Sequence, residues 1–468
     1  MCLVGGFMVL LDVSIVNVAL PAIKTGLQAS QSDLQWVVSG YAVTFGLVLV
    51  PAGRIGDLRG RRTVFVLALA GFTLASAACG AAPSSLFLVV ARLIQGIAGG
   101  ALTPQISALI QQMFRGAERG KAFGIFGAVV GISTAIGPLL GGLLIAAFGT
   151  SQGWRAVFFV NVPVGVLAIL LTLRLVPAHV ETGRRSRHDF DPVGLLLLAL
   201  AALLLLLPFV EDRQWSNTGW LLVPAAFVVA AGFLLWDRRY ARLGKEPVVD
   251  FRLFRRRSYA FGTAMITLYF AGFTPLFFVF TLYLQIGLNY SALAAGLAIT
   301  PFALGSGATA AVAGRVVHRF GRPLVAIGLV LVVVGFVGCD VAVHLVPSHG
   351  TGWATVAPLV VAGIGNGMVI SPNQALTLSE VPVPQAGTAG GLLQTGQRIG
   401  AAVGIAAVGA AFFARVVSSH GRDFAGAFEY GIVVAVAFVA AALVAALVDI
   451  RVDHHRRRSR GRHVAAHR

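Results

Sequence analysis

Gly53-Arg54-Ile55-Gly56-Asp57-Leu58-Arg59-Gly60-Arg61-Arg62 is a short charged stretch between two apolar runs, each long enough to cross a lipid bilayer. A gap of about ten residues between two membrane helices predicts a helical hairpin, in which glycines let the backbones pack closely. Four arginines place the hairpin on the cytoplasmic side. Asp57 is expected at the cytoplasmic start of a helix, within reach of arginine partners.

A weaker copy of the stretch lies in the second half of the chain, as Gly314-Arg315-Val316-Val317-His318-Arg319-Phe320-Gly321-Arg322. Gly, Arg, Gly and Arg recur in register, at 53, 54, 60 and 61 and again at 314, 315, 321 and 322. This recurrence predicts a chain built from two related halves. The copy has His318 in place of Asp57, which argues against a charge-based latch at the second hairpin.

The composition indicates a polytopic membrane protein. Hydrophobic residues make up 57% of the chain and charged residues 12%, whereas soluble domains are about 25% charged. A large soluble helical protein, the alternative, would need helices with polar faces, and the apolar runs lack them. The net charge of +18 raises the question of nucleic-acid binding, but the positions of the charges favour a membrane topology.

About fourteen apolar spans are predicted. They run near 1–20, 35–52, 63–82, 86–111, 122–147, 156–176, 192–210, 219–236, 259–284, 292–313, 323–345, 353–377, 387–414 and 427–449. Lys and Arg concentrate on the loops of one side and in the tail, which predicts that both termini are cytoplasmic. The basic residues expected on the opposite side are Lys24, Arg155, Arg213, Arg415 and Arg422.

Four regions follow from this pattern. Residues 1–176 form an N-terminal six-helix bundle, and 177–258 contain two linker helices with basic cytoplasmic flanks. Residues 259–449 form a C-terminal six-helix bundle, and 450–468 are a basic cytoplasmic tail. The tail carries His454 and His455 among arginines, so metal or nucleic acid is an alternative ligand, but contact with anionic lipids is the favoured interpretation.

Charged side chains inside the spans are candidates for function, because a charge at the centre of a membrane helix costs about 2.5–3.5 kcal/mol. Asp12 lies well inside the first span, and Asn17 is expected to share its face. Arg92 and Gln95 are three residues apart on one face of the fourth span. Asp340 is the clear buried acid expected in the second half. A structural Asp hydrogen-bonded to a neighbouring helix is the alternative for Asp12.

The fifth span carries a helix-breaking pattern, Gly137-Pro138-Leu139-Leu140-Gly141-Gly142. Proline in the middle of a helix removes a backbone hydrogen bond and bends the helix, and the glycines give a slim packing face. The pattern predicts a bend at a helix interface, with a structural role or a flexing or sealing role.

These motifs resemble those of the major facilitator superfamily. The motifs on which the resemblance rests are Gly-x-x-x-Asp-x-x-Gly-Arg-Arg around Asp57, the segment around Arg92, and Gly137-Pro138. Further matches resemble its fourteen-helix drug:proton antiporter branch, and they lie at 11–21, 154–165, 191–194, 250–254, 283–285 and 390–400. The resemblance covers essentially the whole chain. It implies an all-α major facilitator fold, with two pseudo-symmetric six-helix bundles plus two extra linker helices, fourteen transmembrane helices in all.

The resemblance also implies export of amphipathic drugs, dyes or antibiotics in exchange for protons, through a bacterial inner membrane and without a cofactor or metal. No Walker-type loop or catalytic constellation is present in the sequence, so we expect a secondary transporter and not an enzyme. Small amphipathic substrates, protons and anionic lipids are the expected partners, nucleic acid is not, and a monomer is expected. A narrow exporter of one metabolite or self-made antibiotic is the alternative, and a non-transporting membrane sensor is less favoured.

Site residues are carried over onto matching positions. Proton coupling is assigned to Asp12, Arg92 and Asp340. Gating at the cytoplasmic hairpins is assigned to Gly53, Asp57, Gly60, Arg61, Arg62, Gly314, Gly321 and Arg322. The antiporter helix kink is assigned to Gly137, Pro138, Gly141 and Gly142. The substrate cavity is assigned to Asn17, Gln95, Asn161, Tyr283, Gln285, Asn373, Gln394, Gln397 and Arg398.

Overall fold

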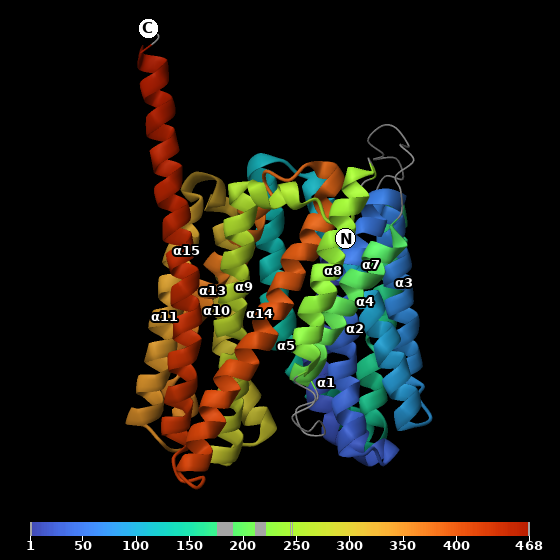
Figure 1. Ribbon diagram of the computed structural model, residues 1–468. Helices are drawn as coiled ribbons and strands as arrows, with labels where there is room; N and C mark the ends of the chain where they lie inside the picture. The colour runs from blue at the N-terminus through green and yellow to red at the C-terminus, as the bar shows by residue number, and fades with distance from the viewer. Residues whose placement is uncertain (1, 176–190, 211–220, 244, 246, 467–468) are drawn as a thin grey trace. The chain divides into compact units, whose positions relative to one another are not determined.

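The computed structural model describes residues 2–175, 191–210, 221–243, 245 and 247–466 (Figure 1). Every long element in these residues is an α-helix. The helices are α1 Cys2–Leu27, α2 Gln31–Arg59, α3 Arg61–Gly80, α4 Ser85–Met113, α5 Gly116–Phe159, α6 Asn161–Leu175, α7 Pro192–Val210, α8 Leu222–Arg242, α9 Arg257–Leu282, α10 Ala292–Phe320, α11 Arg322–Leu345, α12 Thr351–Ala354, α13 Val356–Thr377, α14 Ala386–Ser418 and α15 Phe424–Ala466.

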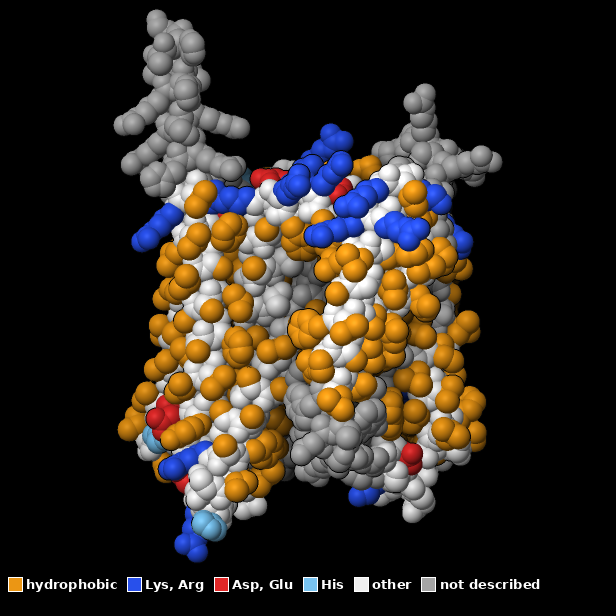
Figure 2. All heavy atoms as spheres, viewed as in Figure 1, with side chains coloured by type: hydrophobic (Ala, Val, Ile, Leu, Met, Phe, Trp, Pro, Cys, Tyr) orange, Lys and Arg blue, Asp and Glu red, His pale blue; other side chains and the backbone are white. Residues whose placement is uncertain are grey.

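Within the described residues, twelve helices are long and apolar enough to cross a membrane, so the chain is a multi-pass membrane protein. Hydrophobic side chains cover the length of the helices, and Lys and Arg gather near their ends (Figure 2). The two helices expected near 192–210 and 219–236 are present as α7 and α8 but are not among the twelve. The apolar stretch described in α7 is short, and the last turns of α8 carry Asp237, Arg238 and Arg239.

The expectation of a loop of about ten residues between the two helices of the first hairpin is wrong. α2 runs through Arg59 and α3 begins at Arg61, so Gly60 alone makes the turn, with a positive φ of 96°. The second hairpin is equally short, because Gly321, with φ 58°, is the only residue between α10 and α11. At about 1.5 Å per residue, α2 and α10, with 29 residues each, are longer than the apolar layer of a bilayer. Asp57 accordingly lies in the last turns of α2 and not at a helix start.

The chain divides into two compact units. Unit 1 comprises Met1–Met113, Val129–Phe251 and Pro382–Thr395, and unit 2 comprises Phe114–Ala128, Arg252–Val381 and Gly396–Arg468. Each unit therefore contains one helix segment from the other half of the sequence, the first part of α5 in unit 2 and the first part of α14 in unit 1. The linker helices, expected as a separate region over 177–258, group with unit 1 as far as Phe251.

The two units repeat one close helix contact. In unit 1, Gly96 and Gly100 of α4 pack directly on the backbone of α2 at Tyr41 and Phe45. In unit 2, Gly363 and Gly367 of α13 pack in the same order on the backbone of α10, at Phe302 and Ser306. A Cβ at any of the four glycines would overlap a carbonyl oxygen of the facing helix. The repeated contact agrees with the internal repeat expected from the hairpin sequences.

The linker helices are fixed to unit 1 by a buried seam. Val50 of α2 forms an apolar cluster with Leu195 of α7, Phe233 of α8 and the segment Val248–Val249. Asp191 closes the seam, because its carboxylate accepts hydrogen bonds from the backbone N–H of Gly194 and from the indole of Trp236. α7 and α8 lie side by side along their length (Figure 1).

Candidate functional site

Asp12 and Arg92 form a buried ion pair in unit 1. Asp12 lies on α1 and Arg92 on α4, and their side chains are 0% and 2% exposed. Arg92 Nη1 donates to Asp12 Oδ2 at 2.6 Å and to Gln95 Oε1 at 2.8 Å. Gln95 Nε2 donates to Asp12 Oδ1 at 2.9 Å. The three residues singled out in the sequence therefore form one hydrogen-bonded cluster.

Asn161 completes the cluster from the start of α6. Its Nδ2 donates to Asp12 Oδ1 at 3.2 Å and to Ser76 Oγ at 3.1 Å. Ser76 in turn donates to the carbonyl oxygen of Phe158. Asp12 thus receives donors from α4 and α6 on one oxygen and Arg92 on the other. The carboxylate therefore has three donors, one of them a guanidinium.

The surroundings of Arg92 were only partly visible in the sequence. Arg92 Nε donates to the carbonyl oxygen of Val37 at 3.0 Å, and the guanidinium lies 4.2 Å from the centre of the Tyr41 ring. Sequence reasoning missed Tyr41 and Ser76. Both are polar groups inside apolar spans, and that signal would have found them. Val37 contributes only its backbone, which no side-chain pattern reveals.

Asn17 does not join this cluster, which corrects the expectation that it shares a face with Asp12. Asp12 is buried and Asn17 is exposed. Five residues advance an α-helix by about 500°, which leaves the two side chains about 140° apart.

A second polar site in unit 1 surrounds Asp57, whose side chain is 2% exposed. Its Oδ1 accepts hydrogen bonds from Gly387 N at 3.0 Å and from Arg61 Nη2 at 2.8 Å. Its Oδ2 accepts from Thr388 N at 2.8 Å and Thr388 Oγ1 at 3.0 Å. Because α14 begins at Ala386, the carboxylate satisfies the unpaired N–H groups of its first turn and faces the positive end of its dipole.

The other residues of the first hairpin support this site. Arg61 also donates to the carbonyl oxygens of Ala108 and Val383, and Arg62 donates to the carbonyl oxygen of Leu173 at 2.7 Å. Gly53 lies against the backbone of Gly387, where a Cβ would overlap a carbonyl oxygen. The hairpin of α2 and α3 is thereby joined to α4, α6 and the start of α14.

The second hairpin has a different set of partners. Arg322 Nε lies 2.9 Å from Asp449 Oδ2 of α15, and Arg257 Nη2 lies 2.8 Å from Asp449 Oδ1. Arg322 also donates to Ser258 and to Asn373. Gly314 packs on the backbone of α5, at Gly120 and Gly124. His318, which replaces Asp57 in the repeat, is exposed.

Asp340 is not the main buried acid of the second half, which corrects the sequence expectation. Its side chain is 21% exposed, and it lies beside His344, with 3.7 Å between Oδ1 and Nδ1. His344 also lies 3.6 Å from Glu429 of α15. The buried acid is Asp449, which is 5% exposed. The last expected span ends at Asp449. The sequence does not single this residue out, because its partners lie far away in the chain.

The remaining candidate residues are dispersed in unit 2 and the first part of α14. Asn373 is fully buried. Its side chain accepts a hydrogen bond from Arg322 and donates one to the carbonyl oxygen of Gly262. Tyr283 is buried at a π-helical turn that follows α9, with its ring 5.7 Å from that of Phe428. The others differ in exposure: Gln394 and Gln397 are buried, and Gln285 and Arg398 are half-buried.

The glycine–proline motif of α5 packs against α1. Gly137 lies against Ser14, and Gly141 lies against Ile15, whereas Gly142 has open space at its Cβ position. The helix continues through Pro138, and its one non-helical residue is Gly149, with φ 78°. The packing face matches the sequence interpretation. Gly149 marks the boundary between the fifth and sixth membrane spans, Gly116–Gly149 and Ser151–Leu175.

Comparison with known proteins identifies the family. The profile of the Major Facilitator Superfamily matches residues 2–405. A probable actinorhodin transporter of Streptomyces coelicolor is 37% identical over 412 residues, which cover 86% of this chain and 70% of that protein. The tetracenomycin C resistance and export protein of Streptomyces glaucescens is 35% identical over 421 residues, covering 88% of this chain and 75% of that protein.

The fold also matches a solved structure. The proton:xylose symporter XylE, bound to 6-bromo-6-deoxy-D-glucose, superimposes with a TM-score of 0.65 over 95% of this chain and 93% of the symporter, at 16% sequence identity. The helical arrangement, the match over most of the sequence and the two named relatives agree with one another. The chain belongs to the major facilitator superfamily.

Proposed function

We propose that the protein is a secondary exporter, which moves amphipathic drugs, dyes or antibiotics out of the cell in exchange for protons. The observation that supports this most is the buried cluster of Asp12, Arg92, Gln95 and Asn161. Charges inside a membrane protein are costly and mark ion pathways and proton relays. The two named relatives, one a transporter and the other an export protein, support the direction of transport.

The cluster suggests how proton binding is coupled to movement. In the structure, Arg92, Gln95 and Asn161 all donate hydrogen bonds to the Asp12 carboxylate. Protonation of Asp12 removes the ion pair and leaves Arg92 with Val37, Gln95 and the Tyr41 ring. A proton therefore favours a state in which α1, α4 and α6 are less tightly joined. A cationic substrate competes for the same carboxylate, which links export to proton entry.

The Asp57 site and the Asp449 site are proposed to control the interchange between states. Asp57 binds the first turn of α14, and Asp449 joins α9, α11 and α15. Neither group is assigned to substrate binding. Asp340 stays a candidate for proton coupling, next to His344 and Glu429.

A narrow exporter of one compound is the second candidate. The two relatives are each named after a single compound, actinorhodin and tetracenomycin C. Growth-inhibition profiles over many compounds separate the two. Protection against one structural class favours the narrow exporter, and protection against unrelated classes favours the multidrug pump.

The topology that we propose is that of the fourteen-helix branch, in a bacterial inner membrane with both termini cytoplasmic. The additional helices α7 and α8, between the two halves of the sequence, support this branch. Lys and Arg near one set of helix ends support the orientation, with anionic lipids as their partner (Figure 2). The side chains of the tail from 453 onward lie outside the described residues. We propose that the protein works as a monomer.

Asp12→Asn tests the coupling. We expect purified Asp12→Asn protein to fold but to lose substrate-induced proton release, and proteoliposomes to lose proton-driven efflux. Asp33→Asn is the matched control, because Asp33 caps the start of α2 at Ser30 and lies outside the cluster. Asp12→Glu, which keeps a titratable group, should recover part of the release. Full proton release from Asp12→Asn would move the coupling role to another acid.

A further inference from the structure

One face of α9 carries a stripe of threonine and phenylalanine. Thr263, Thr267, Phe270, Thr274, Phe277 and Thr281 recur at intervals of three and four residues, so they share one side of the helix. All six are half-buried. We call them the Thr–Phe stripe. It runs for most of the length of α9 and contains neither a charged residue nor an aliphatic Leu, Ile or Val.

The neighbours of α9 define where the stripe lies within unit 2. On the side opposite the stripe, Gly272 packs on the backbone of α15 at Ala435. On one flank, Gly400 and Gly404 of α14 pack on the backbone of Thr267 and Ala271. On the other flank, Phe302 of α10 contacts Phe277, with 4.9 Å between the ring centres. The stripe therefore occupies the side of α9 between α10 and α14.

The composition of the stripe differs from that of a lipid-facing helix side in the same unit. α11 carries a stripe with similar spacing, made of Ile327, Val330, Val334, Val337 and Val341, each 45–55% exposed. That stripe is wholly aliphatic, as contact with lipid chains requires. The Thr–Phe stripe differs from it in its lower exposure and in its two partly exposed aromatic rings, which favour contact with molecules that have a π-surface.

Three aromatic residues of α9 and α10 pack beside the stripe. The Phe273 ring lies between the rings of Tyr269 and Phe302, at 5.3 Å and 5.6 Å, and is nearly parallel to the first. Tyr269 donates its hydroxyl to Asn366, and Asn366 donates to Ser306. Phe270 and Phe277 of the stripe both stand roughly perpendicular to Phe273, at 5.6 Å and 5.2 Å. Their positions are thereby fixed before any ligand binds.

We propose that the Thr–Phe stripe of α9 is a substrate-binding surface that selects flat, fused-ring aromatic compounds. This rests on the proposed export function, of which it specifies the substrate class. The partly exposed rings of Phe270 and Phe277 supply aromatic contact area. The Thr267 hydroxyl donates to the carbonyl oxygen of Thr263, and the Thr263 hydroxyl oxygen is buried, so these two hydroxyls are not offered as donors to a ligand. Because the stripe has no charge, it discriminates by ring shape and not by the charge of the substrate.

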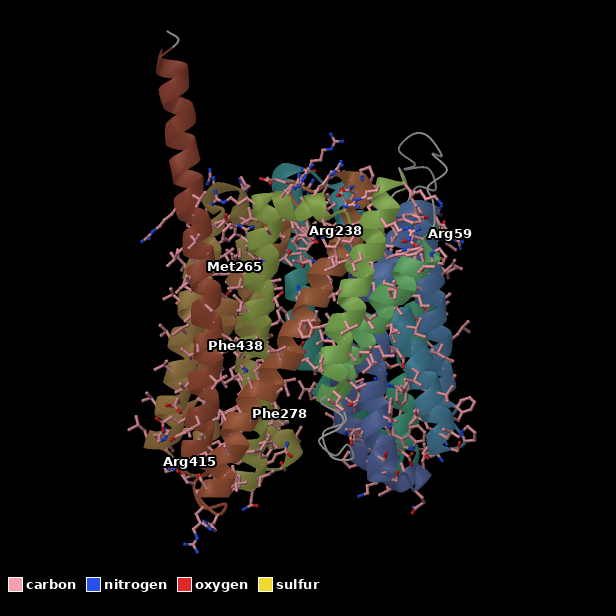
Figure 3. All side chains as sticks on the ribbon, viewed as in Figure 1. Arg59, Arg238, Met265, Phe278, Arg415 and Phe438 are labelled. Carbon is pink, nitrogen blue, oxygen red and sulfur yellow. The ribbon has the colours of Figure 1, made fainter. Side chains whose placement is uncertain are left out.

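The test compares two monovalent cations that differ in shape, flat aromatic ethidium and aliphatic tetrapentylammonium. The variants are Phe270→Leu and Phe277→Leu, both at partly exposed positions. The matched control is Phe278→Leu, labelled in Figure 3, which lies on the same helix but packs against Phe413 of α14. The readouts are the concentration that gives half-maximal proton release from the purified protein and, independently, ethidium binding by fluorescence anisotropy.

We expect each stripe variant to weaken ethidium binding and raise its half-maximal concentration about 2- to 12-fold, the range for loss of one aromatic contact. Tetrapentylammonium should change less than twofold, and Phe278→Leu should change neither. Equal weakening for both cations, or no change for ethidium, would overturn the proposal. If the wild-type protein releases no protons but its ethidium binding still depends on Phe270 and Phe277, the proposal of proton-coupled export is wrong and the proposal of a binding surface is supported.

Discussion

The carboxylate of Asp57 and the backbone N–H of Thr388 lie 2.8 Å apart, although 331 residues separate them in the sequence. The Asp57 carboxylate, in the last turns of α2, thus binds the N-terminal turn of α14. Such a contact favours the state in which it is formed, and it touches no group that we assign to substrate binding.

Asp57→Asn should slow transport while substrate affinity stays within a few-fold. Loss of the negative charge weakens the contact with α14 by about 1–2 kcal/mol, which corresponds to about a 5- to 30-fold change in the population of that state. Turnover in proteoliposomes and equilibrium binding of a fluorescent substrate measure the two quantities. Thr388→Val, which removes one neutral donor, should have a smaller effect. Unchanged turnover in Asp57→Asn would leave Asp57 as a determinant of topology only.

Arg92→Ala should abolish efflux, and Arg92→Lys should retain only part of it. The guanidinium binds Asp12, Gln95 and the carbonyl oxygen of Val37 at once, and an ammonium on a flexible stem cannot reproduce this geometry. Proton-driven efflux is measured in proteoliposomes, and size-exclusion profiles check that each variant folds. Arg155→Lys, at a partly buried position away from Asp12, is the control. Normal efflux by Arg92→Ala would contradict the role of the ion pair.

Asp449→Asn should lower the thermal stability of the purified protein. Asp449 is paired with two arginines, Arg257 and Arg322, in a largely buried position, and removal of one partner of a buried pair costs about 3–5 kcal/mol. Asp423→Asn makes the same chemical change at the more exposed pair with Arg415 and should cost at most about 1 kcal/mol. The comparison uses melting temperatures in detergent. Equal shifts for the two variants would contradict the importance of the Asp449 network.

Single cysteines at positions 186, 255 and 460 should be protected from a membrane-impermeant maleimide in intact cells, whereas a cysteine at 216 should be labelled. Positive charge near the helix ends places the first three positions in the cytoplasm. Labelling after permeabilisation shows that each cysteine is reactive. A cysteine at 460 that reacts in intact cells would exclude the proposed fourteen-span topology.

The elements and the first charged cluster were predictable because their signals are local. Each expected apolar run overlaps a helix, although helices such as α2 and α15 extend well beyond the run. Asp12, Arg92 and Gln95 were recognisable as polar residues inside such runs. A charged residue in an apolar helix needs a partner. The partner of Asp12 is Arg92, which is itself a charged residue inside an apolar run.

The partners of Asp57, Arg322 and Asp449 were not predictable. Asp57 binds backbone N–H groups, which every residue has, so nothing in the sequence marks Gly387 and Thr388 as its partners. Asp449 lies at the end of a span, where an acid is common, and only the fold brings it to Arg257 and Arg322. Asn17 lies about 140° from Asp12 around α1, so a separation of five residues does not put the two side chains on one face.

The matching glycine contacts of α4 on α2 and of α13 on α10 separate what the two halves share from what they do not. Four residues before the first glycine of each pair, one half has Arg92 and the other has the buried Leu359. The packing seam was retained in both copies, while the ionisable group is present in only one. In the proposed mechanism the proton-binding group lies in the N-terminal half, which leaves the C-terminal half free to supply an apolar, aromatic surface.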